Sequence, residues 1–146
     1  MQYLNIFFQD YCGHSQIYEA VSDLILVGEW VFGKALFGEE WAESKRASFD
    51  ALDAPLLPDG FRARGAREAL TRLRDLAETF LSECLDAIRW DEYSIVGFTS
   101  VYSQHVPSLS LARLVKEHFS GTITAFGGAN CQEVMGRTLL KLFPFV

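Results

Sequence analysis

The sequence predicts an α/β protein with a small parallel sheet, and two observations lead to that prediction. Residues 94–99 and 122–126 are short apolar runs. The hydroxyl residues Thr99 and Ser100 close the first run, and Gly127 and Gly128 follow the second. The residues between them are predicted to form one amphipathic helix over 105–119, which is long enough to connect two parallel strands by a crossover. We therefore expect the two strands to be neighbours in one sheet.

The N-terminal part of the chain adds one predicted strand and two short helices. Residues 3–8 (YLNIFF) indicate a strand, and residues 15–26 carry apolar side chains at helical spacing. Residues 29–37 form a second predicted helix between two glycines. Residues 39–64 are polar and contain Pro55, Pro58 and Gly60, so we expect a loop or a helix–loop excursion there.

The middle and end of the chain contain the clearest helices. Residues 66–88 place a stripe of apolar side chains on one face, which is typical of a helix packed on a core. A last helix follows Gly127 and Gly128. Asn130 is its expected N-cap, because Glu133 stands three residues later as in a capping box.

These elements define a single domain over 1–146 with only three predicted strands. We expect a three-layer Rossmann-like (flavodoxin-like) parallel sheet that is truncated to about three strands. A sheet so narrow leaves exposed edges, which proteins usually cover. The sequence therefore predicts a homodimer, with a contact rich in Phe and Trp at residues 30–37 or 143–146.

Composition excludes several classes of function. The net charge of −6 provides no basic surface for nucleic acid or an anionic membrane. No apolar run approaches the length of about 18 residues that a membrane span needs, and the N-terminus lacks the basic start of a signal peptide. Three cysteines without framework spacing fit a reducing compartment, so we expect a cytoplasmic protein.

The ends of the two central strands are the candidate site. Ligands of parallel sheets bind outside the carboxyl ends of the strands, where Thr99 and Ser100 follow one strand and Gly127 and Gly128 follow the next. The hydroxyls could bind a ligand, or Ser100 could cap the following helix. The glycines could admit a flat ligand, or they could simply form a tight turn.

The amino-acid sequence around these residues resembles that of a known family. VGFTSVYSQHVPSLSLARLVKEH, TAFGGANCQEVMG and LFPFV are similar to the N-terminal cobalamin-binding domain of B12-dependent radical-SAM enzymes that mature ribosomal peptides (RiPPs), and VGEWVFGKALFG resembles a stretch upstream in that domain. Cobalamin-binding domains of the methionine-synthase type carry a Ser and a Gly-Gly at the same strand ends. The resemblance implies that cobalamin binds to the following residues: Thr99, Ser100, Val101, Tyr102, Gln104, Gly127, Gly128, Ala129 and Asn130.

Two departures from the family limit the implied activity. None of the histidines, His14, His105 and His118, lies in the axial-ligand motif Asp-x-His-x-x-Gly, so we expect base-off cobalamin without a protein histidine. We interpret His105 as an ordinary exposed residue. There is also no Cys-x3-Cys-x2-Cys motif, so we expect no iron–sulfur cluster and no catalysis by this chain alone.

Other residues receive structural interpretations. Cys131 is predicted to lie at a helix N-terminus, where the helix dipole lowers the pKa of a thiol, but no catalytic base is near it in the sequence. Trp30, Phe32 and Phe37 are expected to be packing residues and not a ligand cage. Relatives continue beyond both ends of this sequence, so the resemblance implies a fragment whose partner is a radical-SAM catalytic domain.

Three functions follow in order of preference. The first is a cobalamin-binding module of a radical-SAM peptide-maturation system. The second is a degenerate, dimerising interaction or scaffold domain that binds no cofactor. The third is a flavodoxin-like domain for another flat cofactor or a nucleotide, because a fold does not determine a function.

Overall fold

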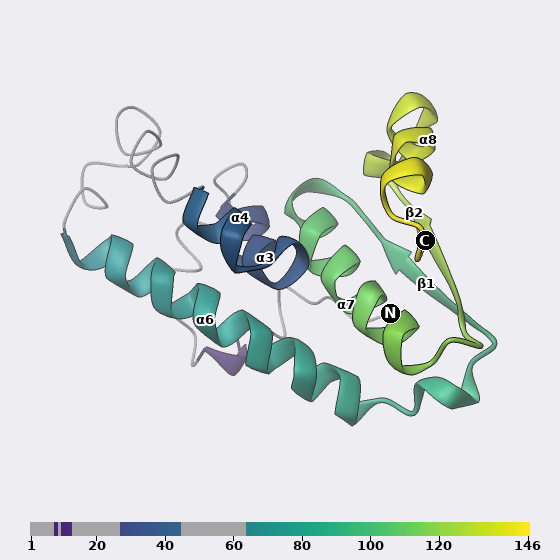
Figure 1. Cartoon of the computed structure of the whole chain (residues 1–146), viewed down its shortest axis with the longest axis horizontal. Coiled ribbons are helices and arrows are strands. Elements are labelled where there is room, and N and C mark those ends of the chain that lie inside the picture. The colour runs from purple at the N-terminus through teal and green to yellow at the C-terminus, as the bar shows by residue number, and fades with distance from the viewer. Residues whose placement is uncertain (1–7, 9, 13–26, 45–63) are drawn as a thin grey trace.

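The computed structural model describes residues 8, 10–12, 27–44 and 64–146 (Figure 1). Within these ranges helices dominate, and the chain is an α/β protein with one small sheet. The main elements, in chain order, are α3 (Val27–Phe37), α4 (Glu39–Ser44), α6 (Arg64–Ala87), β1 (Ile95–Thr99), α7 (His105–His118), β2 (Ile123–Gly127) and α8 (Glu133–Leu142). Short 3-10 turns, η2 (Trp90–Glu92), η3 (Tyr102–Gln104) and η4 (Ala129–Cys131), connect them.

The central β1–α7–β2 unit confirms the main prediction from the sequence. β1 and β2 are parallel neighbours, with Ile95 opposite Ile123 and Thr99 opposite Gly127. The predicted boundaries of both strands and of α7 are correct within one residue. The carboxyl ends of the strands therefore lie side by side, as a shared site requires.

The two faces of this sheet differ in their surroundings. One face carries Phe98 and Phe126, whose stacked rings lie 5.1 Å apart, and α7 packs against it through Val115. The other face carries Ile95 and Ile123, which are 63% and 57% exposed. No described residue covers that face, so a three-layer arrangement is not seen in the described part of the chain.

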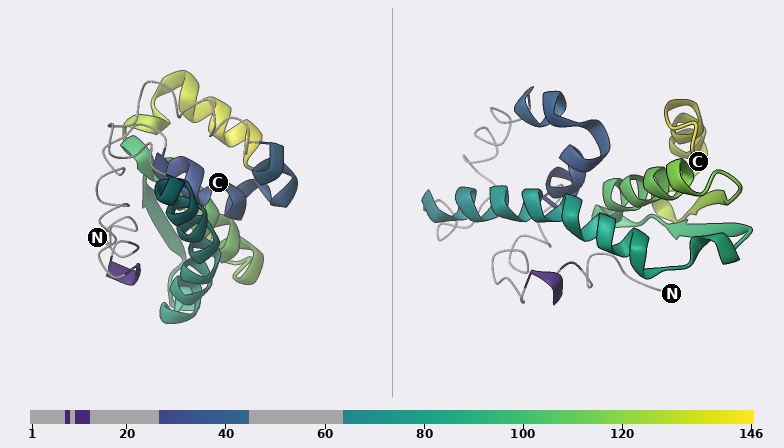
Figure 2. Two further views of the ribbon diagram at one scale, coloured as in Figure 1. Left: turned by 90° about the vertical axis from the view of Figure 1, so that its left-hand side faces the viewer. Right: turned by 60° about the horizontal axis from the view of Figure 1, so that its bottom comes forward.

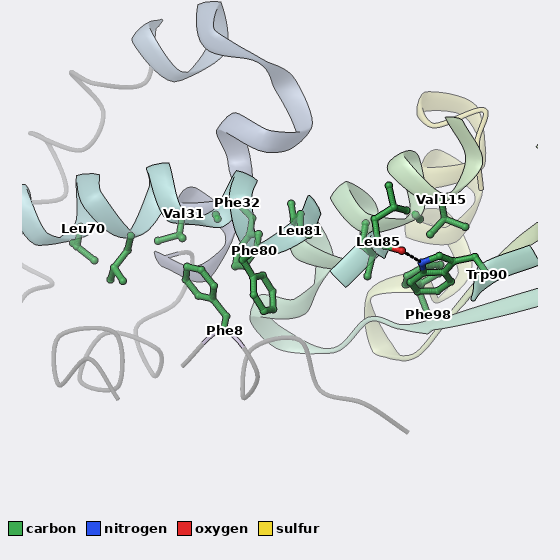
Figure 3. Close-up of a cluster of buried hydrophobic side chains, with 14 residues drawn as sticks. Phe8, Val31, Phe32, Leu70, Phe80, Leu81, Leu85, Trp90, Phe98 and Val115 are labelled. Atoms are coloured by element: carbon green, nitrogen blue, oxygen red, sulfur yellow. Dashed lines mark hydrogen bonds between the residues drawn. The ribbon is translucent and has the colours of Figure 1, made fainter. Parts of the chain in front are cut away.

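The main core lies where α3, α6 and α7 meet (Figure 3). Phe8, Phe32 and Phe80 form its centre, with edge-to-face ring pairs at centroid distances of 4.9 and 5.1 Å from Phe8. Trp90 closes the other end and donates its indole N–H to the Leu85 carbonyl at 2.8 Å. Each buried aromatic ring contributes about 2–3 kcal/mol, so this cluster holds the helices together. The interpretation of Phe32 as a packing residue is confirmed.

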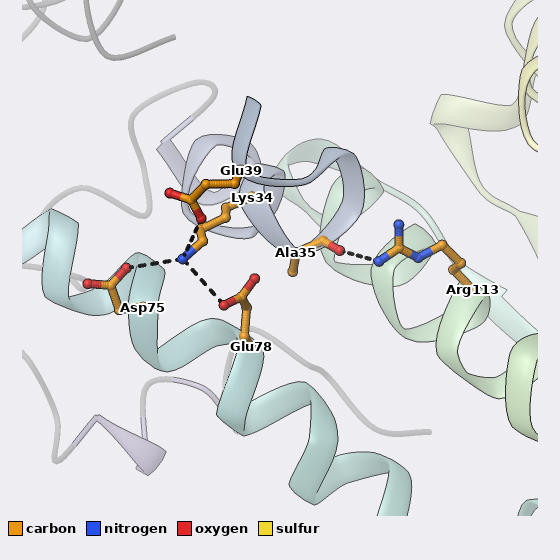
Figure 4. A network of polar contacts seen from close by, with 6 residues as sticks. All are labelled: Lys34, Ala35, Glu39, Asp75, Glu78 and Arg113. Carbon is orange, nitrogen blue, oxygen red and sulfur yellow. Dashed lines mark hydrogen bonds and ion pairs between the residues drawn. The ribbon is translucent and has the colours of Figure 1, made fainter. Parts of the chain in front are cut away.

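Two basic side chains fasten α3 to its neighbours (Figure 4). Lys34 forms ion pairs with Glu39 of α4 at 3.0 Å and with Glu78 of α6 at 3.5 Å. Arg113 of α7 donates to the carbonyls of Ala35 and Leu36 at 2.6 and 2.7 Å. Because these carbonyls lie at the C-terminal end of α3, the guanidinium also complements the helix dipole. The C-terminal end of α3 is therefore held in a defined position beside α7.

Figure 2 shows α3 and α7 on the same side of the long helix α6. The two strands lie near the C-terminal end of α6. α8 returns from the sheet toward α3 and α7. Its Leu139 is buried with Leu36 of α3 and Leu109 of α7 in a second cluster. Thr124 of β2 donates a hydrogen bond to the Phe145 carbonyl, which fixes the chain end beside the sheet. These contacts place α8 next to the beginning of α7.

Several predictions from the sequence are wrong or fall outside the described residues. Phe8, expected at the end of a strand, is helical, whereas residues 3–7 and the predicted helix 15–26 lie outside the described ranges. Residues 39–44 form α4, which agrees with the helix–loop alternative for this segment, because Glu39 and Glu40 favour a helix N-terminus. The N-cap of α8 is Gln132 and not Asn130, whose side chain is bound elsewhere. No described helix has the length and apolar character needed to cross a membrane.

The expected dimer contact stays a prediction, but only part of residues 30–37 is exposed for it. Val31, Phe32 and Leu36 are buried inside the chain, so α3 cannot present them to a second copy. Phe37 is 44% exposed, but its ring packs on Trp41 and faces Phe143. Among the described residues, the aliphatic side chains that are more than half exposed lie instead on the open sheet face (Ile95, Ile123) and on α8 (Val134, Met135, Leu140, Leu142).

Candidate functional site

A groove of about 560 Å3 lies beyond the carboxyl ends of β1 and β2. The beginnings of α3 and α7, the turn after β1 and one side of α8 form its walls. Its lining residues are Glu29, Tyr102, His105, Val106, Asn130, Val134, Met135, Thr138, Leu139, Leu142 and Phe143. Its volume and its mixture of many apolar and few polar groups are typical of a small-molecule site.

Hydrogen bonds join the two loops that leave the strands. The Ser100 N–H donates to the Gly127 carbonyl at 2.7 Å, and the Asn130 N–H donates to the Ser100 carbonyl at 3.1 Å. The side chain of Asn130 donates to the Tyr102 carbonyl at 3.0 Å and to Ser100 Oγ at 3.1 Å. The space directly between the strand ends is therefore closed, and the open volume lies to one side, toward α8.

Gly128 is required by this close approach of the two loops. Its φ is +100°, and a Cβ at this position would lie 2.5 Å from the Ser100 carbonyl oxygen. Only glycine avoids both the backbone strain and the collision. A Cβ on Gly127 would meet no atom within 4 Å. The tight-turn interpretation is thus correct for Gly128, which has a structural role whatever its other functions.

His105 is not the exposed residue expected from the sequence. It is half-buried at the start of α7, and its Nδ1 lies 2.7 Å from Ser100 Oγ. Burial lowers the pKa of this imidazole, so the neutral form is favoured. Ser100, which is fully buried, therefore does not cap α7, and its hydroxyl is bound to the His105 ring.

Glu29 of α3 caps α7 instead. One carboxylate oxygen accepts the His105 N–H at 3.0 Å, and the other accepts the Val106 N–H at 2.5 Å. Burial raises the pKa of Glu29, and these two hydrogen bonds oppose that shift. The carboxylate occupies the place at the helix N-terminus where an anionic ligand often binds.

The wall opposite these polar groups is apolar. Val134, Met135 and Leu142 of α8 are 66%, 55% and 66% exposed, and each of them lines the groove. Tyr102 stands at the rim, 92% exposed, with a φ of +48° that a non-glycine residue rarely adopts. Strained backbone of this kind is concentrated at ligand sites.

The structure brings together only some of the residues implied by the family resemblance. Tyr102 and Asn130 line the groove, and Ser100 lies directly behind them. Thr99 and Gly127 belong to the exposed face of the sheet. The remaining residues, Val101, Gln104, Gly128 and Ala129, are in the adjoining turns and do not line the groove.

Sequence reasoning missed Glu29, His105 and the apolar side of α8. Glu29 is 76 residues from His105, and no motif connects them. His105 had one usable signal, because it follows Ser100 by five residues at a helix start, which is within reach of a side-chain hydrogen bond. The apolar residues of α8 have a signal in the sequence, because Val134, Met135, Leu139 and Leu140 lie on one side of a helix.

The cysteines are free and do not form a site among the described residues. Cys12 and Cys84 have pKa values raised to about 11 by burial, so their thiols stay protonated. Burial also raises the pKa of Cys131, contrary to the expectation of a lowered value, because this residue lies in η4 and not in the first turn of α8. Within the described ranges, no group of three His, Cys, Asp or Glu side chains could hold a metal ion.

No protein-family model matches the chain, and no curated protein and no solved structure gives a match to it. The resemblance to cobalamin-binding domains therefore stays a prediction from the sequence. The geometry of the groove is the independent observation on which a function has to be based.

Proposed function

We propose that this chain is a small-molecule-binding module and that its site is the groove between α7 and α8, with cobalamin as the first candidate ligand. The observation that carries this proposal is the position of the groove. It lies at the carboxyl ends of two parallel strands, with a polar floor of Glu29, His105 and Asn130 and an apolar wall from α8. This is where parallel α/β sheets bind their ligands.

The residues present fit the edge of a corrin and not a whole cobalamin. Tyr102, Asn130 and His105 can hydrogen-bond the amide side chains of the ring, while Met135 and Leu142 can pack on its apolar edge. A complete cobalamin is larger than the groove, so most of the ring would be covered by another domain. The expected direct contact with Ser100 does not fit, because its buried hydroxyl is already bound to His105 and Asn130.

When bound, cobalamin supplies a cobalt centre that carries a methyl group or transfers an electron. The residues of this chain hold one edge of the ring and exclude water from it. The base-off cofactor without a protein histidine stays a prediction, because it depends on the absence of the axial-ligand motif from the sequence. A radical-SAM catalytic domain is the proposed partner, and the two strands are proposed to belong to a three-layer Rossmann-like sheet.

Retention of hydroxocobalamin after desalting tests this function. We expect the absorbance of bound cobalamin to elute with the wild-type protein. Met135→Trp fills the groove from an exposed position, so it should abolish retention, whereas Leu76→Trp, at an exposed position on α6 outside the groove, should have no effect. Loss of colour from both the wild type and the Leu76→Trp variant would exclude cobalamin as the ligand.

A dimerising interaction domain is the second candidate, and the exposed apolar side chains favour it. Ile95 and Ile123 on the open sheet face and Leu140 on α8 are each more than half exposed. Surfaces of this kind often mark contacts between proteins. Sedimentation at micromolar concentration distinguishes this candidate: a dimer that becomes a monomer in Ile95→Lys/Ile123→Lys supports it, and a wild-type monomer excludes it.

A nucleotide or another phosphate-bearing cofactor is the third candidate. Phosphates of such ligands usually bind the free N–H groups at the start of the helix that follows a strand. Here the first two N–H groups of α7 donate to the Glu29 carboxylate. These N–H groups are therefore not free to bind a phosphate, and we rank a nucleotide below an uncharged ligand as the candidate for this groove.

A further inference from the structure

The hydrogen bonds behind the groove determine which nitrogen of His105 carries its proton. The amide nitrogen of Asn130 must point to the Tyr102 carbonyl, because a carbonyl only accepts hydrogen bonds. The same nitrogen then donates to Ser100 Oγ. The hydroxyl proton of Ser100 needs another acceptor, and among the described residues only His105 Nδ1 lies within hydrogen-bonding distance of it.

The opposite tautomer would leave this proton without an acceptor. Ser100 is fully buried, so an unsatisfied hydroxyl there would cost about 1–3 kcal/mol. The neutral ring therefore accepts at Nδ1 and carries its proton on Nε2. Nε2 of His105 is therefore a hydrogen-bond donor. His105 lines the groove, so this donor is the polar group that the residue can offer to a ligand.

Glu29 determines the charge that the same end of the groove tolerates. Its carboxylate accepts two N–H groups of α7 and also lines the groove. The helix N-terminus is thus already neutralised by an internal anion. A carboxylate, sulfonate or phosphate beside it would meet a like charge in a partly buried place, where repulsion is stronger than in water.

The opposite side of the groove adds an apolar requirement. Val134, Met135 and Leu142 of α8, together with Val106 of α7, offer hydrocarbon and thioether surface to a ligand. Thr138, the hydroxyl residue on this wall, donates its proton to the Val134 carbonyl of its own helix at 2.8 Å. The body of a ligand on this side gains mainly from burial of apolar surface.

We propose that the groove selects an uncharged, largely apolar part of its ligand, which places a carbonyl-type acceptor on Nε2–H of His105, and that Glu29 rejects anionic groups at this place. This inference rests on the proposed binding function of the groove and specifies its ligand class. His105 and Glu29 are then specificity-determining residues, and Ser100 and Asn130 are positioning residues that act through His105.

Two dyes of similar size test the selection. Nile red is flat and uncharged and has one carbonyl, whereas 1-anilinonaphthalene-8-sulfonate is flat and anionic, and the fluorescence of both rises in an apolar site. We expect Nile red to bind the wild type and the sulfonate dye to bind weakly. Glu29→Gln should raise the affinity for the sulfonate dye about tenfold, with no such gain for Nile red.

Matched variants assign the effect to the groove. His105→Phe should weaken Nile red about fivefold through loss of one hydrogen bond, and His118→Phe, at the other end of α7, should not. Glu40→Gln on exposed α4 is the control for Glu29. Met135→Trp should reduce binding of both dyes. Circular dichroism of each variant verifies that the helices are intact.

The tautomer has a readout that requires no ligand. The 15N shifts of the His105 ring in the free wild-type protein should show a protonated Nε2 and an unprotonated Nδ1 at pH 8. A protonated Nδ1 overturns the inference, and so does equal binding of both dyes in the wild type and Glu29→Gln, although the groove would then remain a binding site. Failure of both dyes and of hydroxocobalamin to bind rejects the proposed function together with this inference.

Discussion

Removal of the Glu29 carboxylate tests how α3 and α7 are joined. Glu29→Ala leaves the His105 and Val106 N–H groups without the acceptor that now lies 3.0 and 2.5 Å away. Loss of an N-cap usually costs about 0.5–2 kcal/mol, and a two-oxygen carboxylate cap lies at the upper end of that range. Burial of the carboxylate, which raises its pKa, offsets part of the gain. We therefore expect a loss of about 2 kcal/mol in the free energy of unfolding.

Urea unfolding followed by circular dichroism measures this loss. With an m-value of about 1.5 kcal/mol/M, the midpoint should fall by about 1.3 M at an unchanged slope. Glu29→Gln keeps one amide oxygen as an acceptor and should lose about 1 kcal/mol. Glu40→Ala, an exposed site on α4, is the control. A Glu29→Ala midpoint equal to that of the control would refute the capping role.

Three further outcomes follow from the structure. Gly128→Ala should destabilise the chain by about 3 kcal/mol because of its positive φ and the collision with a carbonyl, whereas Gly127→Ala should change stability by less than about 0.5 kcal/mol; chemical denaturation of the pair measures both. The pKa of His105 is lowered in the folded state, so its stabilising contribution is complete above the unfolded pKa of about 6.5 and is lost as pH falls below that value. The stability difference between the wild type and His105→Gln should therefore shrink from pH 7.5 to pH 5, and a difference independent of pH would contradict this. Arg113→Met should lower the unfolding free energy by about 2 kcal/mol through loss of two charge-assisted hydrogen bonds to α3, as differential scanning calorimetry would detect.

The parts of the fold that depend on local pattern could be predicted from the sequence. β1, α7 and β2 were predictable because apolar runs, an amphipathic helix and terminal glycines lie within one continuous stretch. The capping of α8 was not, because Asn130 fits a capping box in sequence but is bound to Ser100 and Tyr102 across the sheet end. A tertiary hydrogen bond thus replaced a local one.

The candidate site was predictable in position but not in composition. Strand ends can be located from the sequence. Tyr102 and Asn130, which line the groove, were implied only by the family resemblance. Glu29 could not be found, because its role depends on the packing of α3 against α7 and not on any spacing. Ser100 has the expected position, but its hydroxyl lies behind the groove, since only coordinates show which way a side chain points.

The cap that Glu29 provides also determines the order in which the molecule can assemble. Residues 94–146 contain both strands and two walls of the groove, yet the start of α7 is completed by a residue far upstream. Contacts of such long sequence separation form late, because closing a long loop has a high entropic cost. The strand–helix–strand unit can therefore become ordered before the polar floor exists. The groove can bind a ligand only after α3 has packed against α7. Ligand binding therefore requires that the whole domain has folded.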